Sequence, residues 1–244
     1  GVADLTSFIG VVHGIVSGTD RPATQFAYPG MPKFRDINND GKIDDKDLAV
    51  IGNTTPVHTG GFYLNASYKN IDLGVNLNWS YGNEIYNANK LASLYGPKEG
   101  GVYENKLSFM SNAYKIYDVV NGQLVRLKTP DDINAANTNA RMPLAYNEIG
   151  VASSLGIESG SFLRVNTITL GYTVPKSILS KAGISNLRLY GSIYNVFTIT
   201  GYSGLDPEVG VNDNANSSIY PTTGLDYGAY PRARSFIIGL NINF

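Results

Sequence analysis

The chain has 244 residues, a formal net charge of −1 and no cysteine. This charge, without any Lys/Arg cluster interleaved with aromatic residues, argues against nucleic-acid binding, and the lack of Cys rules out disulfides, thiolate catalysis and Cys-ligated zinc. Charged residues make up only 16% of the chain, while Gly and Tyr number 27 and 17, which is typical of strands joined by polar loops. No apolar run approaches the roughly 20 residues of a membrane helix, so any membrane crossing would use strands.

The chain begins with GVADLTSFIGVVHG, which lacks a charged start, a long apolar core and an A-x-A site. It is therefore not a secretory signal, and either a signal has been removed or the chain begins within a longer protein. We expect a weak strand within residues 7–16. The two histidines, His13 and His58, do not form a metal-spaced pair, so neither is expected to be catalytic.

Residues 36–47, DINNDGKIDDKD, fit the calcium-loop template D-x-[DN]-x-[DN]-G with an acidic residue at position twelve. Carboxylates held so close together repel one another, and a hard divalent cation is the usual remedy. The predicted ligands of a Ca²⁺ ion, in loop order, are Asp36, Asn38, Asp40, the backbone carbonyl of Lys42, Asp44 (direct or through water) and Asp47.

The alternative for this loop is a solvated acidic turn rich in Asn and Gly. Asp47 stands where Glu is usual, and its shorter side chain favours binding through one oxygen. Pro29 and Pro32 precede the loop, so a flanking helix pair is not expected. The sequence predicts a structural clip in an external loop rather than a calcium sensor.

Two alternating runs follow, at residues 62–68 and 71–82. Apolar side chains occupy every second position, and small or polar residues occupy the positions between them. Only Lys69 and Asn70 separate the runs, which predicts a tight β-hairpin. The predicted apolar face of the hairpin consists of Phe62, Leu64, Ala66, Tyr68, Ile71, Leu73, Val75, Leu77, Trp79 and Tyr81.

Two further strands are predicted at residues 161–173 and 187–199, each longer than the roughly 9 to 11 residues of a tilted membrane strand. In the first, the apolar side chains switch parity after Val165, so a bulge near Asn166 or Thr167 is needed to keep them on one face. The chain ends on another alternating strand. Its apolar positions are Phe236, Ile238, Leu240, Ile242 and Phe244.

A soluble β-sandwich also alternates apolar and polar residues. Aromatic residues near strand ends, an Asn/Ser/Gly-rich polar face and alternating loop lengths instead favour a membrane barrel. If Phe244 lies at the periplasmic end, the alternating direction of successive strands places the turn 69–70 and the link 174–186 on the periplasmic side. It places the long segments 83–160 and 201–234 on the extracellular side, and bacterial barrels have the same pattern of short periplasmic turns and long extracellular loops.

Seven segments, taken together and in this order, resemble the SusC/RagA family of TonB-dependent outer-membrane transporters of Bacteroidota. The segments are KFRDINNDGKIDDKD (33–47), IGNTTP (51–56), YKNIDL (68–73), YGNEIYN (81–87), GSFLRVNTITLGYTVP (160–175), YNVFTITGYSGLDPEV (194–209) and DYGAYPRARSFIIGLNINF (226–244). Residues 95–157 depart most from the family pattern, so loops there are candidates for facing substrate or lid.

The resemblance implies an all-β fold, in which residues 1–244 are the C-terminal strands of an antiparallel transmembrane β-barrel of about 22 strands with long extracellular loops and an internal plug. A barrel must close in lipid to satisfy its edges. The chain would therefore be the C-terminal portion of a longer polypeptide, a cleavage product that stays associated, or one chain of a split barrel. Its partners would be the rest of the barrel, the plug and outer-membrane lipid.

The resemblance also implies import of oligosaccharides or peptides across the bacterial outer membrane, with a SusD-like surface lipoprotein as lid. Coupling to TonB would pass through an N-terminal part that these residues do not include. The aromatic Phe244, at the end of an alternating strand, matches the family's signal for barrel assembly. The transported substrate is not readable from these residues.

Two other functions stay open at this point. A calcium-containing polysaccharide hydrolase would need two flanking carboxylates, and Asp206 and Glu208 are the candidates. Their spacing across Pro207 instead suggests a loop anchor, and no partner acid or base stands out, so no enzyme is expected. The other alternative is a secreted calcium-binding β-rich adhesin or glycan-binding module with a dockerin-like loop.

Overall fold

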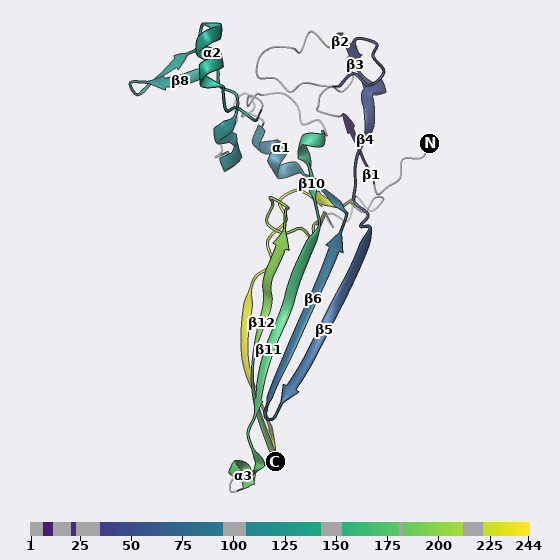
Figure 1. Ribbon diagram of the computed structural model, residues 1–244, viewed down its shortest axis with the longest axis vertical. Coiled ribbons are helices and arrows are strands. Elements are labelled where there is room, and N and C mark those ends of the chain that lie inside the picture. The colour runs from purple at the N-terminus through teal and green to yellow at the C-terminus, as the bar shows by residue number, and fades with distance from the viewer. Residues whose placement is uncertain are drawn as a thin grey trace. The chain divides into compact units, whose positions relative to one another are not determined.

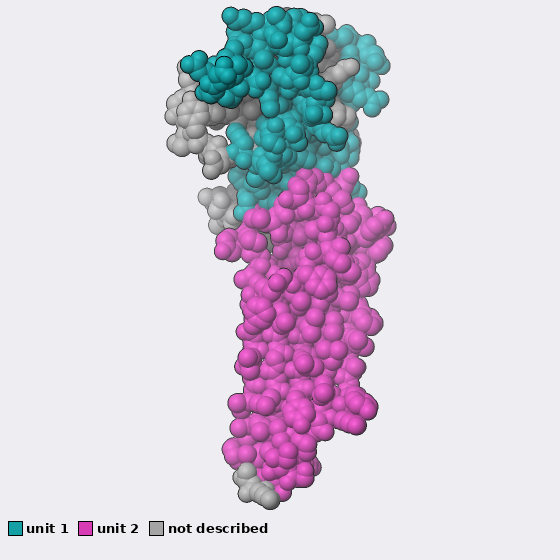
Figure 2. Space-filling view, turned by 60° about the vertical axis from the view of Figure 1, so that its left-hand side comes forward, with its two compact units in different colours: residues 1–53, 86–157, 225–228 teal, residues 54–85, 158–224, 229–244 magenta. Residues whose placement is uncertain are grey.

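The computed structural model describes residues 7–11, 21–22, 35–94, 106–142, 153–180, 183–211 and 222–244. His13 and positions 12–16 of the expected first strand lie outside them. The chain divides into two compact units, coloured separately in Figure 2. The first comprises 1–53, 86–157 and 225–228, and the second 54–85, 158–224 and 229–244.

A five-stranded antiparallel sheet dominates the second unit (Figure 1). Its strands, in spatial order, are β16 (Ser235–Asn243), β12 (Asn186–Thr200), β11 (Phe162–Thr173), β6 (Ile71–Tyr81) and β5 (His58–Tyr68). All five correspond to strands predicted from alternation. The predicted hairpin between β5 and β6 is confirmed, with Lys69 in the left-handed region at φ 55°.

The predicted bulge in β11 is also confirmed. Asn166 is skipped in the register between Val165 and Thr167, against both β6 and β12. On the β12 side the irregularity is larger, because its partner residues jump from Tyr194 to Phe197. An extra residue in a strand shifts the parity of everything beyond it, so the apolar side chains of β11 stay on one face despite their switch in sequence.

The register gives the sheet two unlike faces. One row on the apolar face runs across the strands through Ala66, Leu73, Leu170, Gly191 and Ile238. The side chains of this face are largely exposed, up to 91% for Ile238. Exposed apolar surface of this extent marks an interaction with another protein or a membrane.

The opposite face of the sheet carries small and polar residues. The row beside the one above consists of Asn65, Gly74, Thr169, Ser192 and Ile237. The buried apolar cluster formed by the described residues of this unit is small. It contains Ile85, Tyr202 and Val209, with Ala229 packed against them.

The first unit contains short elements. Strand β1 (Ser7–Val11) pairs with β4 (Leu48–Asn53), which confirms the predicted weak strand over its described residues, and β2 (Arg21–Pro22) pairs with β3 (Lys42–Ile43). Strand β8 (Tyr117–Val120) forms a hairpin with β9 (Gln123–Arg126). The helices in the described part of this unit are α1 (Ala88–Leu94), α2 (Pro130–Ala136) and the 3-10 turns Asp45–Asp47, Ser108–Asn112 and Ser154–Gly156.

The segments expected to be long loops therefore contain regular structure that alternation did not predict. The remaining short elements are β7 (Glu84–Asn87), β10 (Ile157–Ser159), α3 (Lys176–Leu179), β13 (Gly210–Val211), β14 (Thr222–Thr223) and β15 (Leu225–Asp226). Among the described residues, no helix combines the length and apolar character needed to cross a membrane.

Candidate functional site

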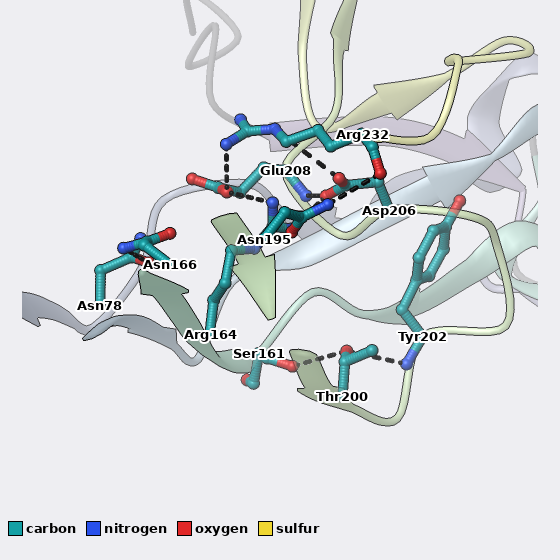
Figure 3. Close-up of polar contacts among 10 residues, drawn as sticks. All are labelled: Asn78, Ser161, Arg164, Asn166, Asn195, Thr200, Tyr202, Asp206, Glu208 and Arg232. Atoms are coloured by element: carbon teal, nitrogen blue, oxygen red, sulfur yellow. Dashed lines mark hydrogen bonds and ion pairs between the residues drawn. The ribbon is translucent and has the colours of Figure 1, made fainter. Parts of the chain in front are cut away.

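Four charged side chains meet on the polar face of the sheet near the start of β11 (Figure 3). Arg164 lies on that face opposite Asn78 and Thr198. Its Nη2 is 2.5 Å from Asp206 Oδ1, and its Nη1 is 3.2 Å from Glu208 Oε2. Arg232 approaches the same two carboxylates, with Nη1 3.2 Å from Glu208 Oε2 and Nε 3.7 Å from Asp206 Oδ2. We call these four residues the Arg164 cluster.

The inner half of the Arg164 cluster is buried. The side chains of Arg164 and Asp206 are 2% and 8% exposed, whereas Arg232 is 54% exposed. Within the described residues, Nε of Arg164 has no hydrogen-bond partner, and Nη1 contacts Glu208 as an ion pair without forming a hydrogen bond. Burying a charge is costly unless it is paired, so the two carboxylates are what allow Arg164 to lie beneath the loop that follows β12.

Further contacts fix the segments that supply the Arg164 cluster. The Glu158 carboxylate accepts hydrogen bonds from the backbone N–H and the hydroxyl of Ser203, both at 2.9 Å. The Asn195 amide, at the β12 irregularity, donates to the Arg232 carbonyl at 2.7 Å. The loop-anchor interpretation of Asp206 and Glu208 is thus confirmed, because both are engaged by arginines.

A second ion pair lies on the same polar face, toward the other end of β11. Arg188 of β12 binds Asp72 of β6 through two hydrogen bonds, Nε to Oδ1 at 2.9 Å and Nη2 to Oδ2 at 2.5 Å. Strand β11 runs between their strands, and the residue it places there is Gly171. A Cβ at Gly171 would collide with both the Asp72 carboxylate and the Arg188 guanidinium, so these two side-chain ends would have to shift if position 171 carried a side chain.

This second ion pair extends into an aromatic contact. The Arg188 guanidinium lies over the Tyr190 ring at 5.2 Å from its centroid, within the range of cation–π attraction. The Tyr190 ring in turn occupies the space above Gly239 of β16, where any Cβ would strike it. Asp72, Arg188 and Tyr190 are called the Arg188 cluster below.

A shallow recess of about 260 Å³ lies beside the Arg188 cluster. Its lining is polar and comes from the polar face of β5, β6, β11 and β12. The lining residues are Tyr63, Asn65, Asp72, Gly74, Asn76, Thr167, Thr169 and Arg188.

Aromatic residues gather at one end of the apolar face. The Trp79 indole N–H donates to His58 Nδ1 at 3.2 Å, and the His58 ring stacks on Tyr81 at 5.1 Å. Gly60 leaves the space that the Trp79 ring fills. His58 is therefore a partner of aromatic side chains, and amphipathic rings of this kind suit the boundary between an apolar and an aqueous layer.

The predicted calcium loop has a defined backbone conformation. Asn39 and Gly41 adopt φ values of 59° and 80°, which turn the N–H groups of Asp40 and Gly41 onto the Asp36 carboxylate at 3.2 and 2.7 Å. Asp47 is fully buried and accepts from Ile37 N–H at 2.7 Å and Asp44 N–H at 2.9 Å. Strand β4 follows the loop directly, in agreement with the expectation that no helix pair flanks it.

The loop meets the chemical requirement for calcium only in part. Its donors are hard oxygens of the kind Ca²⁺ prefers, but both Asp47 oxygens already accept backbone N–H groups. The Lys46 ammonium lies 4.0 Å from both Asp40 and Asp44 and offsets some of their charge. No group of three His, Asp or Glu side chains poised to hold a metal occurs in the described part of the chain. Calcium binding therefore stays a prediction.

The predicted assembly residues of the last strand share the apolar face, as expected. Phe236, Ile238, Leu240 and Ile242 lie opposite β12, and Phe244 is almost fully exposed at the end. Their role in assembly stays a prediction. The Arg164 and Arg188 clusters were not predicted as sites. One sequence feature could have indicated them. Three predicted strands each carry a single charged residue, and it lies on the polar face in each: Asp72, Arg164 and Arg188.

No protein-family model matches the chain. The TonB-dependent receptor P3 of Formosa agariphila is 32% identical over 88% of this chain and 19% of its own length. The TonB-dependent receptor SusC of Bacteroides thetaiotaomicron is 28% identical over 86% of this chain and 17% of its own length. Among solved structures, the RagAB peptide transporter matches with a TM-score of 0.67 and 22% identity over 98% of this chain and 23% of that chain. The RagAB peptide importer in its "closed-closed" state gives a TM-score of 0.64.

These matches, with the two-faced antiparallel sheet, define a segment related to TonB-dependent receptors. More particularly, the predicted relationship to the SusC/RagA type is confirmed by the SusC match, and the RagAB structures share the fold of this chain. The chain spans about a fifth of the length of the curated relatives.

Proposed function

We propose that this chain forms part of the membrane-spanning wall of a SusC-like TonB-dependent transporter in the bacterial outer membrane. The observation that carries the proposal is the exposed apolar face, which continues across all five strands of the sheet. An apolar face of this size needs a cover. In a transmembrane barrel that cover is lipid, and polar side chains point into the lumen.

The strand lengths agree with this assignment. The five strands contain 11, 11, 12, 15 and 9 residues from β5 to β16, close to the roughly 9 to 11 needed to cross a bilayer at a tilt. Among the described strands, the outer strands β5 and β16 each pair with one neighbour. Open edges are not tolerated in lipid, so other strands of a barrel of about 22 would pair with them.

The whole transporter would import oligosaccharides or peptides under a SusD-like lipoprotein lid and be coupled to TonB through a part outside these residues. The similarity to receptors named as TonB-dependent and to a structure titled as a peptide transporter supports this activity. Engagement of Asp206 and Glu208 by arginines supports transport over hydrolysis, since neither carboxylate is left to flank a scissile bond.

The test places one positive charge on either face of the same strand in the intact transporter. Val75 lies on the apolar face of β6 and Asn76 on the polar face. Val75→Arg is expected to cost about 2 to 4 kcal/mol at mid-membrane depth and to lower the heat-modifiable, membrane-inserted form. Asn76→Arg, the matched control, should insert normally.

Phe244→Ser, assayed alongside, is expected to reduce assembly as well. Equal insertion of both Arg variants would overturn the proposal. Recovery of the protein in the soluble fraction without detergent would instead favour the secreted adhesin.

The proposal includes a structural Ca²⁺ held by Asp36, Asn38, Asp40, Asp44 and Asp47 with the Lys42 carbonyl. Support comes from the backbone turn onto Asp36 and from the oxygen donor set. When bound, the ion would neutralise the crowded carboxylates and rigidify the external loop.

Calcium titration of the purified transporter by calorimetry tests this site. Asp36→Asn should abolish binding. Lys46→Gln should tighten it by about fivefold, because it removes a competing cation that is worth roughly 1 kcal/mol at the surface. Lys128→Gln, an exposed lysine outside the loop, is the control. Binding that is unaffected by Asp36→Asn would rule the site out.

A further inference from the structure

The loop that follows β12, residues 201–209, lies on the polar face of the sheet and covers part of it. Arg164 projects from that face and is nevertheless 2% exposed, because Asp206 and Glu208 of the loop close over it. Toward the other end of β11, Asp72 and Arg188 on the same face stay 36% and 26% exposed. The polar face is thus open at one end and crossed by a loop at the other.

The loop is held on both sides of its most exposed apolar residue. Leu205 is 72% exposed. Two positions before it, Ser203 is bound by Glu158, and the next residue, Asp206, is bound by Arg164. Tyr202 is buried, and its ring fills the space beside Gly204.

The Arg164 cluster joins three separate segments through one shared atom. Glu208 Oε2 lies 3.2 Å from Nη1 of both Arg164 and Arg232 (Figure 3). Arg164 belongs to β11, Glu208 to the loop, and Arg232 to the chain just before β16. Loss of the buried Asp206 charge would leave Arg164 under-compensated beneath the closed loop, which would favour release of the loop.

We propose that loop 201–209 is a fixed strap that narrows the transport path, that Arg164 and Asp206 are the residues that position it, and that Leu205 is the side chain it presents to passing solute. This rests on the proposed function, because only in a barrel does the polar face line a path. An apolar side chain held at a fixed position discriminates solutes by their size and shape rather than by their charge. Leu205 is therefore a residue that limits the size of the transported solute.

Cysteine labelling of the intact, detergent-solubilised transporter tests the strap without knowledge of the substrate. The chain has no Cys, so Leu205→Cys introduces a single reporter here. Leu124→Cys is its matched control, since Leu124 is also 72% exposed but lies on the β8–β9 hairpin. The probes are a small maleimide and a maleimide carrying a long polyethylene glycol chain.

The small maleimide is expected to label both cysteines at similar rates, and the large one to label Leu205→Cys much more slowly. Adding Asp206→Asn should raise the rate at which the large maleimide labels position 205 by about tenfold. The loss of roughly one net hydrogen bond shifts the opening equilibrium of the loop by this factor, and the labelling rate follows that equilibrium. If that variant does not assemble, Arg232→Gln, at the exposed end of the cluster, should raise the same rate by a smaller factor.

Equal large-reagent rates at positions 205 and 124 would overturn the strap, as would a rate at 205 unchanged by both Asp206→Asn and Arg232→Gln. These outcomes are distinguishable from failure of the proposed function. A protein that is not a barrel would also tolerate Val75→Arg, whereas a barrel without a strap would not.

Discussion

The Arg164 and Arg188 clusters use the same chemistry on the same face of one sheet but have different surroundings. In each, an arginine of a long strand binds a carboxylate from elsewhere in the chain. The Arg164 cluster joins a strand to a loop and is buried, whereas the Arg188 cluster joins two strands across Gly171 and stays partly solvated. Burial, rather than pairing, therefore decides how much each arginine contributes to the stability of the sheet.

The largest expected difference is between removal of the two arginines. Arg164→Met leaves the buried Asp206 carboxylate with Arg232, 3.7 Å away, as its remaining cationic partner, and loss of one member of a buried pair costs about 3 to 5 kcal/mol. Arg188→Met removes a partly exposed pair, for which about 1 kcal/mol or less is expected. The temperature at which the membrane-inserted transporter loses its compact gel mobility measures both.

The double variant Arg164→Met with Asp206→Leu is the control for the first substitution. It removes both buried charges and should recover part of the lost stability. Equal shifts for Arg164→Met and Arg188→Met would contradict the role given to burial.

The fold of the sheet was largely predictable, because each of its strands alternates apolar and polar residues with a period of two in the sequence. The irregularity at Asn166 was also predictable, because the apolar side chains of β11 switch parity after Val165. A bulge is needed to keep Ile168 on the same apolar face as Val165. Alternation says nothing about short elements of few residues, and so β7 and α2 were missed within an expected loop.

The site was less predictable, because its contacts are distant in sequence. Asp206 lies 42 positions from Arg164, and Arg188 lies 116 from Asp72. Register decides which polar-face residues meet, and the jump in β12 from Tyr194 to Phe197 is not visible in its hydrophobic pattern. The loop-anchor role of Asp206 was predictable only from its spacing to Glu208, without the identity of its arginine partners.

A smaller effect is expected from the glycine that allows the Arg188 cluster to form. Gly171→Ala forces the Asp72 carboxylate and the Arg188 guanidinium apart, since an added Cβ overlaps both. Overpacking of this kind costs about 1 to 3 kcal/mol, and the flexible ends of these side chains place it near the lower limit. The same gel-mobility temperature gives the measurement.

Gly61→Ala is the matched control for Gly171→Ala. Gly61 also lies on the polar face, and its added Cβ would meet only the Leu77 carbonyl at an ordinary 3.5 Å. It should leave the midpoint nearly unchanged. A Gly171→Ala protein as stable as Gly61→Ala would show that the ion pair across β11 contributes little.

The smallest expected effect comes from the aromatic end of the Arg188 cluster. Tyr190→Leu removes the ring beneath the guanidinium, and because Arg188 is partly exposed the contact is worth about 0.5 to 1 kcal/mol. Tyr190→Phe keeps the ring and should be close to the parent protein in the same assay. Combining Tyr190→Leu with Arg188→Met should add no further loss, because the cation is already absent. A full additive loss in the double variant would mean that the Tyr190 ring stabilises the sheet through its packing over Gly239 rather than through Arg188.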